Sequence, residues 1–252
     1  MSQKTIFARE SVNKFYDDTS PEVWKKVIGK DLHYHIGWGE GDIFYNSVEY
    51  LYKFIPKSSS VLDCGCGWGG TGKVIQRDLN CKASGVTNSK NQYDYIKQNN
   101  IFDVVYDDLH DFTPTQEYDV CLFIESFCHL ENPLKVISNV SNHSKKIILR
   151  EYILKNTVEH KRYSEAWMMN MYKKDILISM FKDYGFNLTF EDEHYSYGLE
   201  PTLDLWLNNL KLLDKNEKTP HIRTLEISAK YLKKNLNNIL NDIGLSTFVF
   251  ER

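Results

Sequence analysis

Between residue 58 and about residue 152, short apolar runs alternate with amphipathic stretches. The runs are SSVLDC, CKASGVT, FDVVYD, YDVCLFI and KIILREYI, and each is rich in apolar or β-branched side chains. Strands that alternate with helices in this way form a parallel sheet that helices cover on both faces. The pattern therefore predicts the core of a doubly wound α/β domain.

The flanking regions have a different pattern. Residues 1 to about 57 show no strand signal but two helical stretches, at 11–17 and at Pro21–Ile28, and Ser20 is a natural N-cap for the second. The last hundred or so residues are mostly helical. They are interrupted by a predicted strand at 187–193 and end in LSTFVFER, which we expect to be a closing strand.

Composition narrows the range of partners. The chain has 252 residues, 42% apolar and 26% charged, which is typical of a globular protein with a sizeable core and fits one large domain, one domain with a cap, or two domains. Its net charge of −3 comes without a basic block, and this argues against a nucleic-acid partner. An apolar leader and a run of about 18 apolar residues are both missing, so we expect a cytoplasmic protein without stable membrane insertion.

The five cysteines fit reduced thiols in such a compartment. Cys64 and Cys66 form a pair, but a second pair at zinc-site spacing does not follow it. We therefore expect no metal site.

A glycine cluster, SVLDCGCGWGGTG at 60–72, follows the first predicted strand and leads into a helix at about 70–77. Glycine is costly to order, so five of them in thirteen residues indicate a backbone that approaches a ligand closely. Turns of this kind also bind dinucleotides. However, Asp63 just before the first glycine would repel a pyrophosphate and suits an ammonium or a sulfonium. The cluster therefore favours S-adenosyl-L-methionine over NAD.

The chain contains VLDCGCGWGG, which resembles the first motif of class I S-adenosylmethionine-dependent methyltransferases. Further stretches resemble the branch of cyclopropane fatty acid synthases, mycolic acid modifying enzymes and tocopherol- or sterol-type methyltransferases. These stretches are FYDD (15–18), LHYHIGW (32–38), GVTNSKNQYDY (85–95), FIESFCHLENP (123–133) and TLDLWLNNL (202–210).

The resemblance implies a Rossmann-like, doubly wound, mostly parallel seven-stranded sheet with an antiparallel last strand, N-terminal helices and a helical cap. It makes residues 1–57 an N-terminal helical segment that covers the cofactor. Residues 58–252 become the methyltransferase domain, with the cap inserted at about 155–180 and 194–245. It also implies S-adenosyl-L-methionine as the cofactor.

Carried over residue by residue, the resemblance implies a cofactor site in three parts. The backbone of the glycine turn would lie against the methionine part, and Asp63 would support the turn or the amino group. Neutral hydrogen bonds would hold the ribose, because the second strand ends in GVTNS without the acidic residue of many class I members. The adenine would be flanked by the segment after the third strand. The implied residues are Gly65, Gly67, Gly69, Thr87, Asn88, Gln92, Leu109 and His110, with Tyr34 and His35 folding over the cofactor and the backbone at Ile124 completing the site.

Methyl transfer requires alignment and exclusion of water, and it requires a base only when the acceptor must lose a proton. By family position the candidates are Glu125, His129 and Glu151. For His129 the alternative is a partly buried histidine that a neighbouring carbonyl satisfies. For Glu125 it is a structural hydrogen-bond acceptor at the end of a strand.

The same positions separate two activities within the branch. Ring-forming members resemble this chain but hold a bicarbonate where Ile36, Cys128 and Glu151 stand here, and the added carboxylate would oppose an anion. We therefore expect plain C- or N-methylation of a small molecule. The alternatives are a cyclopropane-type modification of a lipid acyl chain and a non-catalytic protein that binds S-adenosylmethionine.

Aromatic and methionine side chains are frequent between residues 160 and 210, where this branch places its cap. Such residues are often core, but some should face the pocket. They suit an acceptor that is apolar, aromatic or amine-bearing. The oligomeric state is left open between a monomer and a homodimer.

Overall fold

The computed structural model describes Val12, residues 16–156, Ser164 and residues 167–252. The helix predicted at 11–17 lies mostly outside the described residues, as does part of the segment 155–180 that the sequence assigns to the cap. Helix α2, Pro21–Ile28, forms where it is predicted, and the Ser20 side chain accepts a hydrogen bond from the Val23 amide as its N-cap.

One mixed sheet forms the centre of the molecule, with strand order β3-β2-β1-β4-β5-β8-β7. Its strands are β1 (Ser60–Cys64), β2 (Lys82–Thr87), β3 (Asp103–Tyr106), β4 (Tyr118–Ile124), β5 (Ser144–Leu154), β7 (Asn187–Glu193) and β8 (Ile243–Glu251). Only β8 runs antiparallel to its neighbours, β5 and β7. The predicted seven-stranded sheet with an antiparallel last strand is thus confirmed. The short strand β6 (Tyr172–Lys173) adds a parallel pair at the end of β5.

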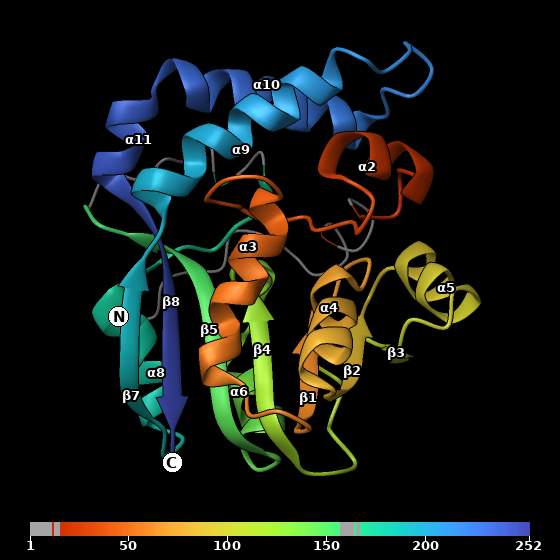
Figure 1. Ribbon diagram of the computed structural model, residues 1–252. Coiled ribbons are helices and arrows are strands. Elements are labelled where there is room, and N and C mark those ends of the chain that lie inside the picture. Colours follow the sequence, from red (N-terminus) through yellow and green to blue (C-terminus); the bar gives the residue numbers. More distant parts are fainter. Residues whose placement is uncertain (1–11, 13–15, 157–163, 165–166) are drawn as a thin grey trace.

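Helices cover both faces of this sheet (Figure 1). One face carries α3 (Ile43–Glu49), the 3₁₀ helix η1 (Tyr50–Phe54) and α4 (Gly70–Leu79), and α5 (Lys90–Gln98) packs beside β2 and β3. The other face carries α6 (Pro133–Ser141) and α8 (Lys174–Lys182). Helix α8 belongs to the segment expected in the cap, but its Leu177 and Phe181 pack in the sheet-side core with Phe250.

The alternation of side chains along the strands explains how both faces of the sheet are buried. In β4 and β5, Phe123 and Ile147 point into the core under α6 and α8, whereas Leu122 and Ile148 point into the core under α3 and α4. Successive residues of a strand face opposite sides, so a strand covered on both faces reads as a continuous apolar run. This is the pattern visible in YDVCLFI.

The strand order reverses direction between β1 and β4. From β1 the chain proceeds outward through β2 and β3, and it then returns to add β4 and β5 on the other side of β1. At such a switch point the loops after adjacent strands diverge, and a crevice opens at their carboxyl ends. The fold therefore places its natural ligand site beside the glycine cluster.

A group of helices lies above the carboxyl ends of the parallel strands (Figure 1). It consists of α9 (Tyr195–Leu210), α10 (Pro220–Lys234) and α11 (Leu236–Asp242), and α2 packs against α9. Trp24 of α2 is buried there with Leu203 and Leu225. None of the described helices is long and apolar enough to cross a membrane.

One buried threonine fixes this cap to the N-terminal segment. Thr202 of α9 accepts a hydrogen bond from the Gly37 amide at 3.0 Å and lies 3.1 Å from the Gly37 carbonyl oxygen. A side chain at residue 37 would not fit, because an added Cβ would lie 2.6 Å from the Ile43 carbonyl oxygen. The close approach of the two segments thus depends on Gly37 and Thr202 together.

We expect Thr202→Val to lower the free energy of unfolding by about 1–3 kcal/mol, because the buried Gly37 amide loses its partner. Urea denaturation followed by circular dichroism measures the change. Thr224→Val on the partly exposed face of α10 is the matched control and should change stability by about 0.5 kcal/mol or less. Equal effects of the two substitutions would contradict this role for Thr202.

Candidate functional site

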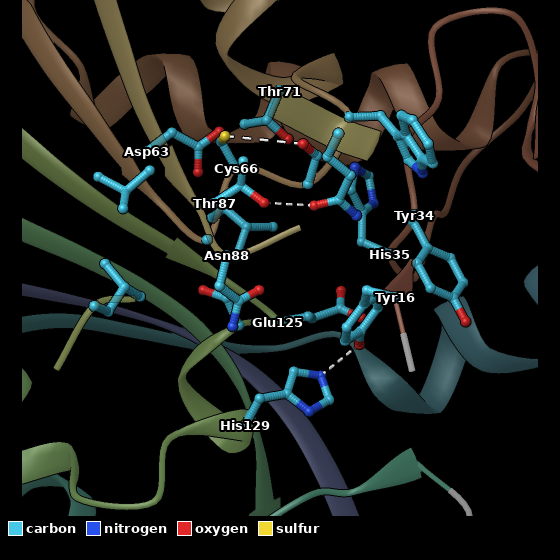
Figure 2. A pocket seen from close by; sticks show the side chains of 18 of the residues that line it. Tyr16, Tyr34, His35, Asp63, Cys66, Thr71, Thr87, Asn88, Glu125 and His129 are labelled. Atoms are coloured by element: carbon cyan, nitrogen blue, oxygen red, sulfur yellow. Dashed lines mark hydrogen bonds between the residues drawn. The ribbon is translucent and has the colours of Figure 1, made fainter. Parts of the chain in front are cut away.

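A pocket lies at the carboxyl ends of β1, β2 and β4, under the N-terminal segment (Figure 2). Most residues that the sequence assigns to a cofactor line it, namely Tyr34, His35, Asp63, Gly65, Gly67, Thr87, Asn88, Gln92, Leu109, His110 and Ile124. Glu125 and His129 line it as well. Gly69 and Glu151 do not belong to the lining.

The glycine turn forms one wall of the pocket. Gly67 has a φ of +54°, and a Cβ added there would meet no protein atom within 4 Å. A side chain at this position would therefore project into the space of the pocket. Gly69 acts on the other side of the turn. A Cβ there would lie 3.2 Å from Ile96 and Phe102, so this glycine allows close packing behind the turn.

Asp63 offers an unpaired acceptor to this wall. The carboxyl group accepts a hydrogen bond from the Gly72 amide, but Oδ2 has no hydrogen-bond partner among the described residues. The residue is 2% exposed, and its burial raises the pKa of the carboxyl group to about 7. A cationic group in the pocket would provide the missing partner, so the site fits a ligand that carries an ammonium.

The end of β2 presents neutral polar groups. The Thr87 hydroxyl donates to Oε1 of Gln92 at 2.6 Å and accepts a hydrogen bond from the Ser89 amide at 3.2 Å. Because the Gln92 carbonyl oxygen is engaged, the group that Gln92 can offer to a ligand is its NH₂. Asn88 lies beside this pair in Figure 2. This arrangement suits hydroxyl groups of a ligand.

His110 is held by hydrogen bonds at both ring nitrogens. Nδ1 lies 2.6 Å from Oδ1 of Asp108, and Nε2 accepts a hydrogen bond from the Asn132 amide at 3.0 Å. Asn132 is the N-cap of α6, so His110 connects the loop after β3 to that helix. What His110 can present to a ligand is therefore the flat face of its ring.

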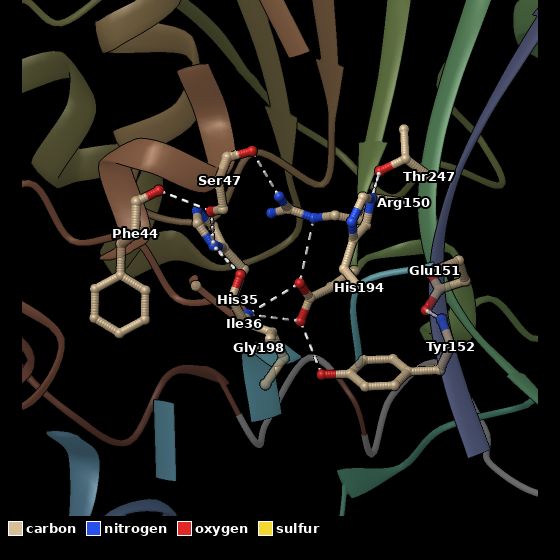
Figure 3. Close-up of polar contacts among 12 residues, drawn as sticks. His35, Ile36, Phe44, Ser47, Arg150, Glu151, Tyr152, His194, Gly198 and Thr247 are labelled. Atoms are coloured by element: carbon tan, nitrogen blue, oxygen red, sulfur yellow. Dashed lines mark hydrogen bonds and ion pairs between the residues drawn. The ribbon is translucent and has the colours of Figure 1, made fainter. Parts of the chain in front are cut away.

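Glu125 anchors the N-terminal segment. Both of its oxygens accept from the Ile36 amide, at 3.0 and 3.1 Å, and Oε2 also accepts from the Tyr152 hydroxyl at 2.8 Å. The guanidinium Nε of Arg150 lies 3.4 Å from Oε1 of Glu125, and Nη1 of Arg150 donates a hydrogen bond to the Ser47 carbonyl oxygen (Figure 3). Burial raises the pKa of Glu125 to about 7 against the opposing effect of Arg150.

Glu151 lies on the neighbouring strand but supports the protein backbone. Its Oε2 accepts from the Cys128 amide at 2.8 Å, and Oε1 accepts from its own neighbour, the Tyr152 amide, at 2.7 Å. Burial raises the pKa of this carboxyl group to about 7. Glu151 therefore fixes the 3₁₀ turn η2 (Phe127–His129), from which His129 projects into the pocket.

His129 points toward Tyr16 and is in direct contact with it (Figure 2). Nδ1 lies 3.0 Å from the Met168 carbonyl oxygen, which can only accept, so Nδ1 carries the hydrogen. Nε2 then accepts a hydrogen bond from the Tyr16 hydroxyl at 2.9 Å. Desolvation lowers the pKa of His129 to about 4, so the imidazole is neutral at pH 7.

The site residues predicted from the sequence did not include Tyr16, although it lies in the stretch FYDD that carries part of the resemblance. His33, Cys66, Thr71 and Asp107 also line the pocket without having been predicted. Asp107 follows β3 directly, and position at the carboxyl end of a parallel strand is the signal that could have identified it.

The ionisable side chains that line the pocket are mostly acidic, although the buried guanidinium of Arg150 lies behind one of them, Glu125. The described lining of the pocket includes four carboxyl groups, on Asp63, Asp107, Asp108 and Glu125, but no lysine or arginine. Desolvation lowers the pKa of His33 and His129 to about 4 and also lowers the pKa of His35, so these three imidazoles do not offset the carboxyl groups. The pocket thus disfavours anionic ligands and favours neutral or cationic ones.

A family model described as a methyltransferase domain matches residues 44–190. Two curated plant proteins are similar over part of the chain. The (S)-tetrahydroprotoberberine N-methyltransferase of Eschscholzia californica is 37% identical over 86 residues, which is 31% of this chain and 24% of that protein. The probable (S)-tetrahydroprotoberberine N-methyltransferase 2 of Papaver bracteatum is 35% identical over 95 residues, 34% of this chain and 26% of that protein. The chain thus matches only about a quarter of the length of these relatives.

Solved structures are similar over nearly the whole chain. The cyclopropane synthase MmaA2 from Mycobacterium tuberculosis superimposes with a TM-score of 0.82 at 16% identity, covering 98% of this chain and 99% of that one. Coclaurine N-methyltransferase, bound to N-methylheliamine and SAH, superimposes with a TM-score of 0.76 at 17% identity, covering 96% of this chain and 85% of that one. At these identities the likeness establishes the fold.

The anchor at Glu125 yields a prediction about stability. Glu125→Ala should lower the free energy of unfolding by about 3–5 kcal/mol, because it leaves the buried Arg150 charge unpaired. Lys230→Ala removes the exposed ion pair to Glu226 and should cost about 0.5 kcal/mol or less. Denaturant titration of both variants measures the contrast. A Glu125→Ala protein as stable as Lys230→Ala would show that the pair does not hold the segment.

Proposed function

Because the chain belongs to the methyltransferase domain family, we propose that it methylates the nitrogen of a small apolar or aromatic amine, with S-adenosyl-L-methionine as the methyl donor. The cofactor is the one predicted from the sequence, and the activity belongs to the methyltransferases as a class. The choice of nitrogen and of an amine goes further, and two features of the pocket, its charge and its aromatic side chains, support it.

The pocket fits the cofactor in its chemistry. The unpaired Oδ2 of Asp63 would receive the ammonium of the methionine part, and the bare backbone at Gly67 would lie against that part. The Gln92 amide and Asn88 would bind the ribose hydroxyls. When bound, S-adenosylmethionine supplies a methyl group on a sulfonium, which is a strong electrophile.

The observation that carries the choice of an amine is the charge of the pocket. Four carboxyl groups line it, and its described lining contains no lysine or arginine. A carboxylate or phosphate on the acceptor would find no counter-charge there, whereas an amine in either protonation state is tolerated. The N-methyltransferases that match about a third of the chain favour the same choice.

Aromatic rings would form the acceptor side of the pocket. Tyr16 and Tyr34 belong to its lining, and their ring centroids lie 6.4 Å apart. Behind Tyr34 pack Trp24 at 4.6 Å and Trp206 at 6.0 Å. Such rings hold an apolar body and also stabilise a methylated ammonium product through cation–π interactions.

Two buried amides argue against the ring-forming alternative. That activity would require an anion beside Ile36 and Cys128 at the place given by the resemblance. The Ile36 amide already donates to Glu125, and the Cys128 amide donates to Glu151. Because protein carboxylates occupy both donors, an added anion would meet negative charge instead of hydrogen-bond donors. This favours simple methyl transfer.

The proposal is tested with radiolabelled S-adenosylmethionine and matched sets of acceptors. Each set contains one amine, for example 1,2,3,4-tetrahydroisoquinoline or N-methyl-2-phenylethylamine, together with an alcohol and a carboxylic acid of similar size. We expect label to enter the amines at a rate at least about tenfold above their oxygen counterparts. Transfer to the acids or alcohols instead would refute the amine assignment. Cofactor binding without transfer to any acceptor would indicate a non-catalytic binding protein.

The cofactor site yields a prediction at Gly67. Gly67→Val should weaken the binding of S-adenosylhomocysteine by about 100-fold or more, because the side chain projects into the pocket and not into the protein. Isothermal titration calorimetry measures this affinity. Gly29→Val is the matched control: Gly29 also has a positive φ, +88°, and an added Cβ there meets nothing within 4 Å.

Both substitutions strain a backbone of positive φ, and Gly29, with a ψ of 168°, lies in a region that is essentially restricted to glycine. A loss of affinity confined to Gly67→Val would therefore not come from strain alone. Only Gly67→Val should lose affinity. If the two variants bind S-adenosylhomocysteine equally well, the glycine turn does not contact the cofactor.

A further inference from the structure

We propose that Tyr16 is the residue that contacts the acceptor nitrogen, and that it passes the acceptor's proton to His129. This inference rests on the proposed function and deepens it. Its starting point is the contact between the Tyr16 hydroxyl and Nε2 of His129, two residues 113 positions apart in the sequence that both line the pocket.

The tautomer of His129 gives this contact a direction. The Met168 carbonyl oxygen fixes the hydrogen on Nδ1, so the lone pair of the ring is at Nε2. The Tyr16 hydroxyl covers that lone pair at 2.9 Å. An acceptor in the pocket therefore meets the phenol oxygen before it can reach the imidazole. A phenol oxygen that donates its hydrogen can accept another at the same time.

The Tyr16 side chain is held in place from two sides. Asp17 accepts a hydrogen bond from the hydroxyl of Ser89, the N-cap of α5. Asp18 accepts from the His221 amide in the first turn of α10 at 2.7 Å. The Tyr16 ring also makes edge contacts with His129 and His221, both at 5.5 Å between centroids. The stretch FYDD thus combines one pocket residue with the two carboxylates that anchor it.

Burial keeps both partners neutral between turnovers. Burial raises the pKa of Tyr16, and nearby Cys128, Glu151 and Glu125 raise it further, so a lasting phenolate is disfavoured. Desolvation lowers the pKa of His129 and keeps it unprotonated at neutral pH. Tyr16 can therefore relay a proton only if its own phenol hydrogen moves to His129 while the acceptor's proton bonds to the Tyr16 oxygen.

The step balances without any additional reagent. As the methyl group is transferred to a secondary amine, the N–H bond breaks, and its electron pair stays on nitrogen. The proton forms a bond to the Tyr16 oxygen while the original phenol hydrogen moves to Nε2 of His129. Tyr16 ends neutral, and His129 becomes an imidazolium that still donates from Nδ1 to the Met168 carbonyl. The imidazolium returns its proton to solvent after product release, which is favourable because burial lowers its pKa.

The test compares Tyr16→Phe, His129→Ala and the double variant on the best secondary amine of the acceptor panel. We expect each single substitution to lower kcat by about 10²–10⁴-fold and the double variant to lose no more than the worse single one, because the two groups act as a unit. KM and the affinity for S-adenosylhomocysteine should stay within about threefold of wild type. Near-normal kcat in Tyr16→Phe, or additive losses, would overturn the relay.

A matched control is present in the same chain. The Tyr197 hydroxyl contacts Nδ1 of His194 at 2.6 Å, outside the pocket. Tyr197→Phe removes a phenol–imidazole hydrogen bond of the same kind and should leave kcat unchanged. N,N-dimethylaniline is the second control. It is largely uncharged at pH 8 and has no N–H to lose, so Tyr16→Phe should slow its methylation far less than that of N-methylaniline. Equal losses on both would assign Tyr16 a structural role.

A measurement without substrate separates this inference from the proposed function. In protein with ¹⁵N-labelled histidine, Tyr16→Phe should shift the Nε2 resonance of His129, and Tyr197→Phe should not. If wild-type protein methylates no amine, the proposed function fails, and the relay fails with it. If amines are methylated but the His129 resonance is unchanged in Tyr16→Phe, only the relay fails.

Discussion

A buried ion pair between two neighbouring strands supports most of the pocket. Glu125 directly follows β4 and Arg150 lies in β5, and between them they bind the backbone at Ile36 and at Ser47. An isolated charge at either position would be very costly in this interior, so each residue requires the other. Because their remaining hydrogen bonds reach the N-terminal segment and α3, the pair positions the segment that covers the pocket. The pocket therefore forms only when strands, helix and N-terminal segment are assembled together.

This construction gives the pocket its chemical character. The carboxylates that hold the backbone also make the lining acidic, and the enclosure that they help to create keeps His129 and Tyr16 neutral. A lining of this kind disfavours anionic ligands. Glu125, which the family resemblance made a candidate base or a structural acceptor, holds the Ile36 amide, the Tyr152 hydroxyl and Arg150 in this structure.

Much of the fold could be predicted from the sequence because its signals are local. Each strand of the parallel sheet is an apolar run that must be buried on both faces, and the glycine cluster after β1 marks the crevice at the switch point. Part of the pocket lining could be predicted for the same reason, since Asp63, Thr87 and His110 lie at or after the ends of strands. Gly69 and Glu151 lie at equally suggestive positions, but one packs behind the turn and the other binds backbone amides. A spacing in sequence does not tell on which side of a turn a group lies.

The sequence by itself determined the doubly wound sheet, the family and the approximate place of the pocket, because periodicity and glycine content follow from short-range steric and solvent effects. Only the tertiary structure decided which polar groups are engaged and which remain available. Tyr16 reaches His129 across 113 positions, and Glu125 reaches Ile36 across 89. Contacts over such separations depend on how the N-terminal segment and the cap close over the sheet, and no local pattern in the chain specifies that closure. The same closure decides the pKa values of the pocket residues, since burial is a property of the assembled molecule and not of the residue.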